Sequence, residues 1–310
     1  MRLLITGGAG CLGAGIVDHR LAQGDTICVI DNFVTSARAA LPAEVEVHEG
    51  SVTDAALLAR VFGAFRPDTV IHAAASYKDP DNWQGDLAVN AGGTLNVLKV
   101  ARESGVRRFV NLQTVLCYGR PASLPVRTDA PLAPFTSYGI SKAAGELYVL
   151  ASGLDAVSLR IGNVTGPRLS IGPVPAFYSR LKEGKPCFCS DTVRDFLDME
   201  DFLALIDRVM LLGAARGVFN AGSGQGRSIL EVYKAVASAL GIEAPLPPVI
   251  PPGADDVAAI VLDSSETERA FGWRPAVSFE ESIRRMVRWY DANGVRAIYA
   301  HVRAPEGFSA

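Results

Sequence analysis

The sequence predicts an α/β fold in which a doubly wound parallel sheet is followed by a smaller, less regular lobe. Short apolar runs alternate with helical patterns through the first half of the 310 residues. A glycine-rich turn directly follows the first apolar run, and prolines and glycines cluster after Arg160, at 166–175 and at 245–253. We therefore expect a sheet domain over 1–165 and a second lobe over 166–310, with a segment near 205–235 returning to the sheet.

The first 31 residues predict a strand, a turn, a helix and a second strand. Arg2–Thr6 is a short apolar run with β-branched residues, long enough for one buried strand. Residues 14–23 have a helical pattern, and 26–30 form another apolar run that ends on Asp31. A glycine-rich turn between a first strand and a helix is the setting typical of dinucleotide binding.

A Rossmann-type cofactor site is predicted by the glycine spacing of that turn. Gly7 would allow the tight turn, Gly10 would let the backbone approach a diphosphate, and Gly13 would let the helix pack close to the sheet. Unpaired N–H groups at the helix start would bind the diphosphate. Asp31 can accept hydrogen bonds from the adenosine ribose and would repel a 2′-phosphate, which favours NAD over NADP. The alternative is an ordinary glycine-rich turn of another α/β protein.

The composition limits the class of protein. The net charge is -3 and 49% of the residues are hydrophobic, so we expect a large core and no general attraction to nucleic acid or an anionic membrane. No stretch approaches the roughly 18 apolar residues of a membrane span. The five cysteines form no C-x-x-C pair and the four histidines lack metal-ligand spacing. We expect a cytoplasmic protein with reduced thiols, without a signal peptide and without a metal.

The remaining elements continue the alternation of strands and helices. Asp54 is positioned to cap a helix over 55–65. The other expected elements are strands at 44–49, 69–72, 108–112 and 217–220, and helices at 86–104 and 283–290. In such a sheet, ligands bind beyond the carboxyl ends of the strands. The glycine turn, Asp31, the small-residue turn 73–76 and Thr114 all follow strands, so we expect them to line one cleft.

Tyr138 and Lys142 are four residues apart, which places both side chains on one face of a helix. A free tyrosine has a pKa near 10, too high for a base at neutral pH. The lysine ammonium and a nicotinamide cation would both favour the phenolate and lower that pKa. Tyr138 would then accept a proton from a sugar hydroxyl whose oxygen Thr114 could also contact. The alternative is an exposed tyrosine–lysine pair without a catalytic role.

As a set, these motifs resemble those of the extended short-chain dehydrogenase/reductase family, and within it the nucleotide-sugar epimerases and dehydratases, of which UDP-galactose 4-epimerase is a familiar member. The resemblance covers nearly the whole chain. It rests on Thr6 to Gly13, His72-Ala73-Ala74-Ala75, Thr114, Tyr118-Gly119, Tyr138-x-x-x-Lys142, residues 159–168, Arg194-Asp195-Phe196 and residues 271–275.

The resemblance implies roles for particular residues. Thr114, Tyr138 and Lys142 would be the catalytic triad, and Asn163 and Arg194 would hold the diphosphate of a nucleotide sugar, with Thr114 also contacting the sugar. An alternative for Arg194 is a surface salt bridge with Asp195 or Asp198. The expected cofactor-binding residues are Gly7, Gly10, Cys11, Leu12, Gly13, Asp31, Asn32, Ser51, Val52, Ala73, Ala74, Ala75, Asn90, Leu112, Tyr138, Lys142 and Ile161.

The sequence departs from the family pattern in several places. Dehydratases usually carry Asp and Glu after the catalytic Thr, whereas this chain has Val115 and Leu116, which cannot transfer protons. Ser51 replaces an Asp that often lies beside the adenine. Many relatives carry an arginine where this chain has residues 251–255, Pro-Pro-Gly-Ala-Asp, and the loop 187–193 is shortened. These departures leave the nucleotide and the sugar open.

Two further assignments are weighed against simpler alternatives. Cys117 lies three residues beyond Thr114, and an acid/base role for it competes with the more common role of a buried, small hydrophobic residue. The walls of the sugar pocket would determine specificity. Candidate wall residues, by their location, are Tyr77, Lys78, Leu116, Phe177 and Cys189.

The favoured hypothesis is an NAD-dependent nucleotide-sugar epimerase that inverts C4 of a UDP- or dTDP-sugar through a transient 4-keto intermediate. The family further implies precursor synthesis for surface polysaccharides and a homodimer formed by helices near 86–104 and 138–152. One alternative is a dehydratase, oxidoreductase or decarboxylase with the same triad. A second is a non-catalytic, regulatory NAD-binding protein.

Overall fold

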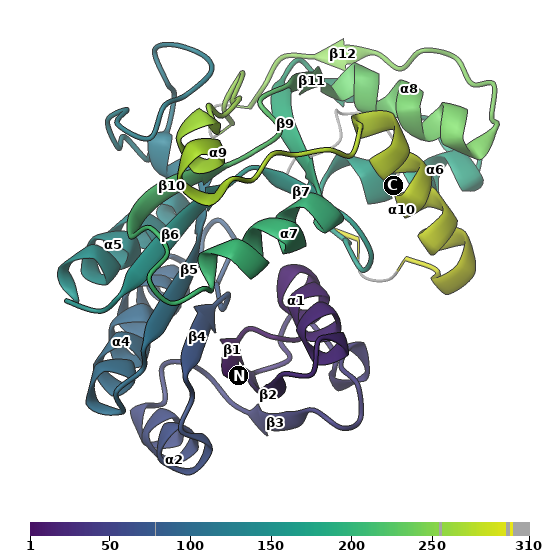
Figure 1. Ribbon diagram of the computed structural model, residues 1–310. Coiled ribbons are helices and arrows are strands. Elements are labelled where there is room, and N and C mark those ends of the chain that lie inside the picture. The colour runs from purple at the N-terminus through teal and green to yellow at the C-terminus, as the bar shows by residue number, and fades with distance from the viewer. Residues whose placement is uncertain (78, 254–255, 296–297, 300–310) are drawn as a thin grey trace.

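The computed structural model describes residues 1–77, 79–253, 256–295 and 298–299. Its main sheet has seven parallel strands in the order β10-β6-β5-β4-β1-β2-β3 (Figure 1). The predicted doubly wound α/β fold is thereby confirmed. The strands are β1 (Arg2–Thr6), β2 (Thr26–Asp31), β3 (Glu46–Glu49), β4 (Thr69–His72), β5 (Arg108–Thr114), β6 (Ala156–Ile161) and β10 (Gly217–Ala221).

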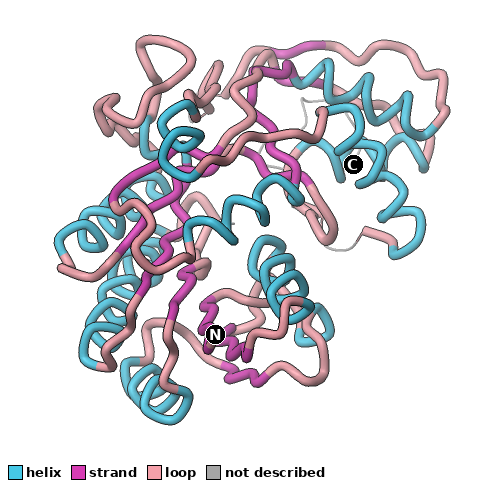
Figure 2. The backbone as a smooth tube through the Cα atoms, in the orientation of Figure 1, coloured by secondary structure: helices cyan, strands magenta, loops and turns pink. Residues whose placement is uncertain are grey.

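Helices cover both faces of this sheet (Figure 2). Leu3 and Ile5 of β1 pack on one face, with α1 (Cys11–Ala22) and α7 (Met199–Val209). Leu4 packs on the other face, with α2 (Ala55–Phe65), α4 (Thr94–Glu103) and α5 (Ser137–Ala151). Because successive side chains of a strand point to opposite faces, an uninterrupted apolar run is what a strand buried on both faces requires.

The second lobe contains two small sheets and three packed helices. One sheet has the order β11-β9-β7 and the other pairs β12 with β8. The helices α6, α8 and α10 enclose a separate apolar core around Phe177, Val232 and Ile283. The lobe's elements are β7 (Asn163–Thr165), α6 (Pro173–Lys182), β8 (Cys189–Ser190), β9 (Val193–Asp198), β11 (Gly226–Ser228), α8 (Ile229–Leu240), β12 (Val249–Ile250) and α10 (Phe279–Asn293). The short helix α9 (Ser265–Phe271) packs instead against β10 and α7 of the main sheet domain.

Most element boundaries agree with the sequence prediction. Asp54 caps α2, and its carboxylate accepts hydrogen bonds from the N–H groups of Ala56 and Leu57 at 3.0 and 2.9 Å. α1 begins at Cys11, not at residue 14, because Gly10 is its N-cap residue. β5 continues to Thr114, beyond the predicted end at residue 112. Two short 3₁₀ turns, η1 (Arg38–Ala40) and η3 (Val115–Tyr118), complete the connections around the sheet.

The predicted helix 86–104 is three consecutive helical segments. α3 (Trp83–Asp86) leads into a π-helical turn, η2 (Leu87–Gly93), before α4 begins. The Thr94 hydroxyl donates to the Asn90 carbonyl at 2.6 Å, and a Cβ atom at Gly145 of α5 would lie 2.6 Å from that same oxygen. The wide turn therefore lies where two helices approach most closely. π-helical turns are often found at functional sites.

Candidate active site

The glycine loop between β1 and α1 has the conformation that a bound diphosphate needs. Gly7 has a φ of +68°, and a Cβ atom there would lie 2.6 Å from the Ala74 nitrogen. At Gly13 a Cβ atom would lie 2.3 Å from the Gly7 oxygen, so this glycine lets α1 pack closely against the turn that directly follows β1. A Cβ atom at Gly10 would meet only the Gly7 oxygen, at 3.3 Å, so this glycine leaves one side of the loop open.

The start of α1 presents backbone donors beside this loop. The first intrahelical bond runs from the Ala14 N–H to the Gly10 carbonyl at 2.8 Å, so the N–H groups of Cys11, Leu12 and Gly13 precede it. The first turn of α1 contains no acidic residue. The donors and the helix dipole therefore fit an anion such as a diphosphate.

Asp31 lies at the end of β2, where it joins the glycine loop to the following turn. Its Oδ2 accepts from the Ala9 N–H at 2.9 Å, and its Oδ1 accepts from the Phe33 N–H and the Ser36 hydroxyl, each at 2.9 Å. The carboxylate is thus held rigidly beside the loop, with its charge in the position that disfavours a 2′-phosphate. Asn32 shapes the same turn, because its Oδ1 accepts from the Val34 N–H at 3.2 Å.

The turn after β4 crosses directly over the glycine loop. The Ala73 N–H donates to the Thr6 carbonyl at 3.0 Å. Asn90 holds the far end of the turn: its amide accepts from the Ser76 N–H and donates to the Ser76 carbonyl, both at 2.8 Å. The same amide donates to the Ser141 hydroxyl at 3.0 Å. Asn90 therefore ties the cofactor turn to the helix that carries Tyr138 and Lys142.

Two other predicted cofactor residues lie at the end of β3. The Ser51 hydroxyl accepts from the Thr53 N–H at 3.1 Å and shapes this turn. Val52 is buried, and a Cβ atom at Gly93 would lie 2.4 Å from its Cγ2. Val52 therefore lies next to the π-helical turn, and both residues follow the carboxyl end of β3.

His72 joins the carboxyl ends of β1 and β4 beneath the site. Its Nδ1 lies 2.7 Å from the Thr6 hydroxyl and its Nε2 lies 2.9 Å from the Thr94 hydroxyl, and both contacts are hydrogen bonds. Burial lowers the pKa of this imidazole to about 3, helped by the charge of Lys142. A neutral histidine that satisfies two hydroxyl groups has a structural role.

The predicted catalytic residues come together at the end of β5. Lys142 is buried, and its Nζ donates to the Leu112 carbonyl at 2.7 Å. In the sheet register, Thr114 pairs with Ile161, which places the end of β6 beside the triad. The ring of Tyr77 meets that of Tyr138 edge-on, with 6.3 Å between the ring centroids. The triad and the cofactor residues therefore share one end of the sheet.

The expected lowering of the Tyr138 pKa is wrong for the chain's own groups. Burial raises this pKa above its usual value, as do Tyr77 and Asp86, whereas a hydrogen bond with Thr114 opposes the rise. The Lys142 ammonium donates to the Leu112 carbonyl. Burial lowers the pKa of Lys142 itself to about 8, while Glu146 raises it. The protein alone thus keeps the phenol protonated.

Sequence reasoning missed Gln113, which lies between the catalytic segments. Its Nε2 donates to the Lys142 carbonyl at 2.7 Å, and its Oε1 accepts from the Thr114 N–H at 2.8 Å. The side chain is only 3% exposed. No sequence signal beyond its position next to Thr114 identifies it, because the second partner lies 29 residues away.

Cys117 is fully buried in a small apolar cluster with Val115, Tyr118 and Leu262. Burial raises the pKa of its thiol to about 12. Such a thiol stays protonated at neutral pH and is a poor base. The structure therefore favours the hydrophobic role of Cys117 over an acid/base role. Leu116 is partly buried against the same cluster and has no group that can transfer a proton.

Arg194 and Asn163, the expected diphosphate ligands, lie at the strands of the second lobe. Arg194 pairs with Asp256, with 2.5 Å between Nη2 and Oδ1, so the expected alternative partners are wrong. Asp195 accepts from Ser223, Gly224 and Leu262 instead, and Asp198 caps α7. The exposed Asn163 donates its side-chain amide to the Asp195 carbonyl at 3.3 Å.

Two of the candidate wall residues belong to the core of the second lobe. Phe177 and Cys189 are buried among the side chains of α6, α8 and α10 and do not face a pocket. Lys78 and residues 254–255 lie outside the described residues. One cavity, about 410 Å³, lies between α1, α7 and α10, lined in part by His19, Met199 and Trp289, and it contains none of the predicted site residues.

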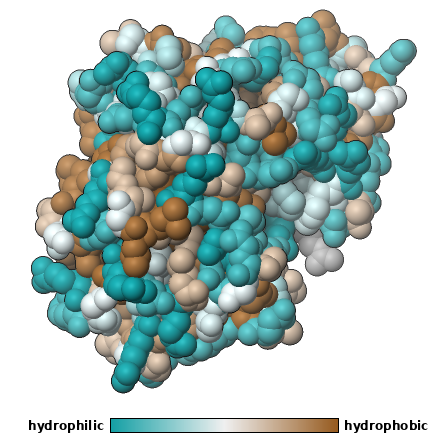
Figure 3. Space-filling model, in the orientation of Figure 1, coloured by the Kyte–Doolittle hydropathy of each residue, from teal (hydrophilic) through white to brown (hydrophobic). Residues whose placement is uncertain are grey.

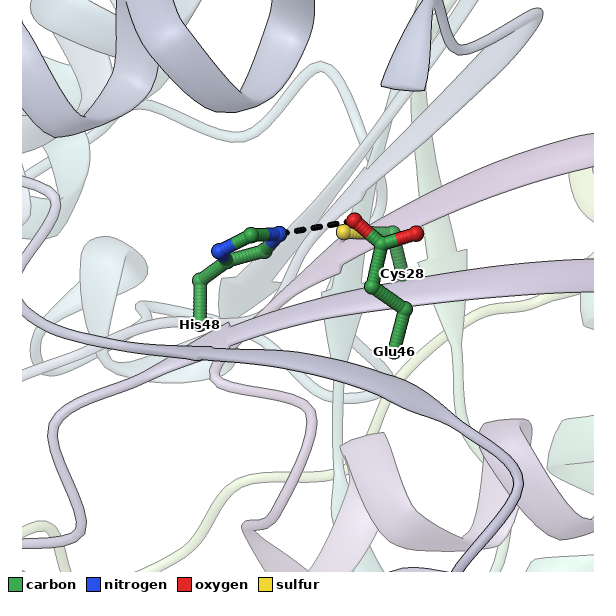
Figure 4. A group of neighbouring side chains, drawn as sticks. All are labelled: Cys28, Glu46 and His48. Atoms are coloured by element: carbon green, nitrogen blue, oxygen red, sulfur yellow. Dashed lines mark hydrogen bonds and ion pairs between the residues drawn. The ribbon is translucent and has the colours of Figure 1, made fainter. Parts of the chain in front are cut away.

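One group of possible metal ligands meets in space although the sequence spacing did not indicate it. Cys28 of β2 and Glu46 and His48 of β3 have ligand atoms within 4.8 Å of one another (Figure 4). His48 and Glu46 already form a hydrogen bond of 2.8 Å. Burial and the Glu46 charge raise the pKa of the thiol to about 12, which opposes metal binding. That the chain works without a metal remains a prediction.

No helix in the described part of the chain is long and apolar enough to cross a membrane.

Comparisons with known proteins agree with this geometry. The model of the NAD dependent epimerase/dehydratase family matches residues 3–222. A UDP-glucose 4-epimerase of Mycolicibacterium smegmatis is 30% identical, covering 94% of this chain and 98% of the relative. The Bordetella bronchiseptica enzyme WbmG in complex with NAD is 55% identical, with a TM-score of 0.93 and 98% of both chains covered. Its complex with NAD and UDP matches with a TM-score of 0.92.

Proposed function

The chain belongs to the NAD-dependent epimerase/dehydratase family as an NAD-dependent nucleotide-sugar epimerase, and we propose that it inverts carbon 4 of a UDP-sugar. One observation supports the proposal above others: the glycine loop, Asp31 and the triad Thr114, Tyr138 and Lys142 lie beyond the same ends of the parallel strands. The UDP-glucose 4-epimerases among the relatives, and the UDP bound to WbmG, support the choice of nucleotide.

In the proposed reaction, Tyr138 accepts the proton of the sugar 4-hydroxyl while the hydrogen on C4 leaves as hydride. NAD, when bound beside the glycine loop, would supply the hydride acceptor and a positive charge that favours the phenolate. Thr114 donates a hydrogen bond to the same sugar oxygen, and Lys142 adds positive charge behind the tyrosine. The 4-keto sugar would then rotate within the site and present its other face to the cofactor. Hydride would then return to the opposite face of carbon 4, and Tyr138 would return the proton to the oxygen, so that no external oxidant is consumed.

The residues beside Thr114 lack the proton-transfer groups that a dehydratase needs. A dehydratase needs an acid and a base beside the 4-keto sugar, and here the two residues after Thr114 are Val115, which is buried, and Leu116, which packs against an apolar cluster. The nearby Cys117 is fully buried and protonated. These environments favour simple epimerisation over elimination of water.

The proposal extends to a homodimer. Leu87 of η2, Leu95 of α4 and Ile140 and Leu147 of α5 are between 46% and 57% exposed, and Figure 3 shows apolar side chains gathered over α4 and α5. Four large exposed apolar side chains on adjacent helices are typical of a protein–protein interface. A second copy of the chain is the expected partner, because two such helix pairs can form a four-helix bundle.

The cellular setting is also proposed. All five cysteines are free thiols, and four of them are buried, which fits the reducing cytoplasm. The family further supports a role in supplying activated sugars for surface polysaccharides.

The experiment that tests the proposal is NMR of the NAD-loaded enzyme with a panel of UDP- and dTDP-sugars in deuterated water. Appearance of the C4 epimer without deuterium uptake is the expected result, because the hydride returns from NAD and not from solvent. Deuterium at C3 or C5, or a 4-keto-6-deoxy product, would contradict the C4 mechanism. The matched control is Tyr138→Phe, which should bind NAD and give no product.

A further inference from the structure

Two arginines face each other across the small sheet of the second lobe. β9 and β11 are antiparallel, and Arg227 pairs directly with Arg194 in their register. Residues opposite one another in an antiparallel pair project from the same face of the sheet. Like charges in that position destabilise a sheet, unless an anion or a carboxylate lies between them.

The counter-ion of Arg194 lies closer than those of Arg227. Asp256 lies 2.5 Å from Arg194. The carboxylates nearest to Arg227 are those of Glu231 and Glu280, at 3.7 and 3.9 Å. Arg227 is therefore held by two looser ion pairs. A backbone hydrogen bond lowers the pKa of Glu231, and the charge of Arg227 and a hydrogen bond from it help to lower that pKa further.

Part of the hydrogen-bonding capacity of Arg227 is unused. Its Nη2 donates to Gln225 at 3.0 Å, and its guanidinium carbon lies 5.3 Å from the centre of the Phe279 ring. Within the described residues, Nε of Arg227 is the one buried side-chain polar atom without a hydrogen-bond partner. Since buried polar groups are nearly always paired, this donor needs an explanation.

The loop that carries an arginine in many relatives offers no substitute here. Residues 251–255 contain no lysine or arginine. A diphosphate has two phosphate groups, each of which can accept the paired donors of a guanidinium. With Arg194 as the only other arginine assigned to this role, the second phosphate lacks a partner of this kind.

We propose that Arg227 is a second diphosphate-binding residue, which acts with Arg194 from the opposite strand. The inference rests on the proposed function, because a nucleotide diphosphate must be the ligand. It goes further in assigning the phosphate contacts to strand β11. The Nε donor points to a phosphate oxygen as its partner, and Phe279 keeps the plane of the guanidinium fixed.

The test is calorimetric titration of the NAD-loaded enzyme with UDP and, separately, with uridine. Arg227→Gln should weaken UDP binding by about 10- to 100-fold, the range for losing a charged hydrogen bond. Uridine binding should stay unchanged because uridine carries no phosphate. Arg227→Lys keeps the charge without the planar fork, and its UDP affinity should fall between wild type and Arg227→Gln. The control is Arg284→Gln on α10, where the arginine is exposed and pairs with Glu281.

Three outcomes separate the inference from the proposal on which it rests. UDP binding by Arg227→Gln that matches the Arg284→Gln control would overturn the inference and leave the epimerase proposal intact. Equal weakening of UDP and uridine binding would show that Arg227 shapes the pocket and does not contact phosphate, which also overturns it. Failure of the wild-type enzyme to bind UDP would refute the UDP-sugar proposal itself, and this inference with it.

Discussion

His72 makes the stability of the sheet beneath the cofactor loop dependent on pH. The imidazole has a pKa of about 3 in the folded chain, whereas an unperturbed histidine has one near 6.5. A lowered folded pKa means that its contribution is fully present above pH 6.5 and is lost as the pH falls toward 3. Each pH unit in this window costs up to about 1.4 kcal/mol, so at pH 5 about 2 kcal/mol should be lost relative to pH 7.5.

The assay is urea unfolding of the wild type and of His72→Gln, followed by circular dichroism at pH 7.5, 6.0 and 5.0. The glutamine can still bond with the threonine hydroxyls but cannot become charged, so the variant should lose less stability on acidification. Every other titratable group is common to both proteins. The difference between their pH dependences therefore isolates His72. Parallel pH profiles would refute the reasoning, because the buried imidazole would then not determine the slope.

Three further predictions concern the catalytic residues and the dimer. Tyr138→Phe should abolish turnover while retaining bound NAD, as measured by absorbance and product NMR; residual epimerisation above a tenth of wild type would argue against a tyrosine base. Gln113→Leu should lower the unfolding free energy by about 1–3 kcal/mol, because it leaves the Thr114 N–H unpaired, and should reduce kcat more than the affinity for UDP. Wild-type affinity and kcat would exclude a positioning role. Leu147→Glu should shift the protein from dimer to monomer in analytical ultracentrifugation, whereas an exposed substitution elsewhere, such as Leu246→Glu, should not.

The spacing of residues close together in the sequence was enough to predict many of this protein's structural elements. The strand, glycine turn, helix and second strand of residues 1–31 form as the sequence predicts, and the capping of α2 by Asp54 was visible in the same way. These features depend on residues only a few positions apart, whose backbone preferences and hydrogen bonds are local. The candidate triad could also be predicted, because Tyr138 and Lys142 lie on one helix and Thr114 ends a strand.

Only the tertiary structure decided which distant groups meet. Asp256, 62 residues away, is the partner of Arg194, and the strand register places Arg227 opposite it. Gln113 joins Thr114 to the Lys142 backbone, and burial raises the pKa of Tyr138, opposite to the expected direction. A pKa depends on burial and on every charge nearby, and a register depends on how whole strands pack. Neither the pKa nor the strand register can be obtained from the spacing of residues along the chain.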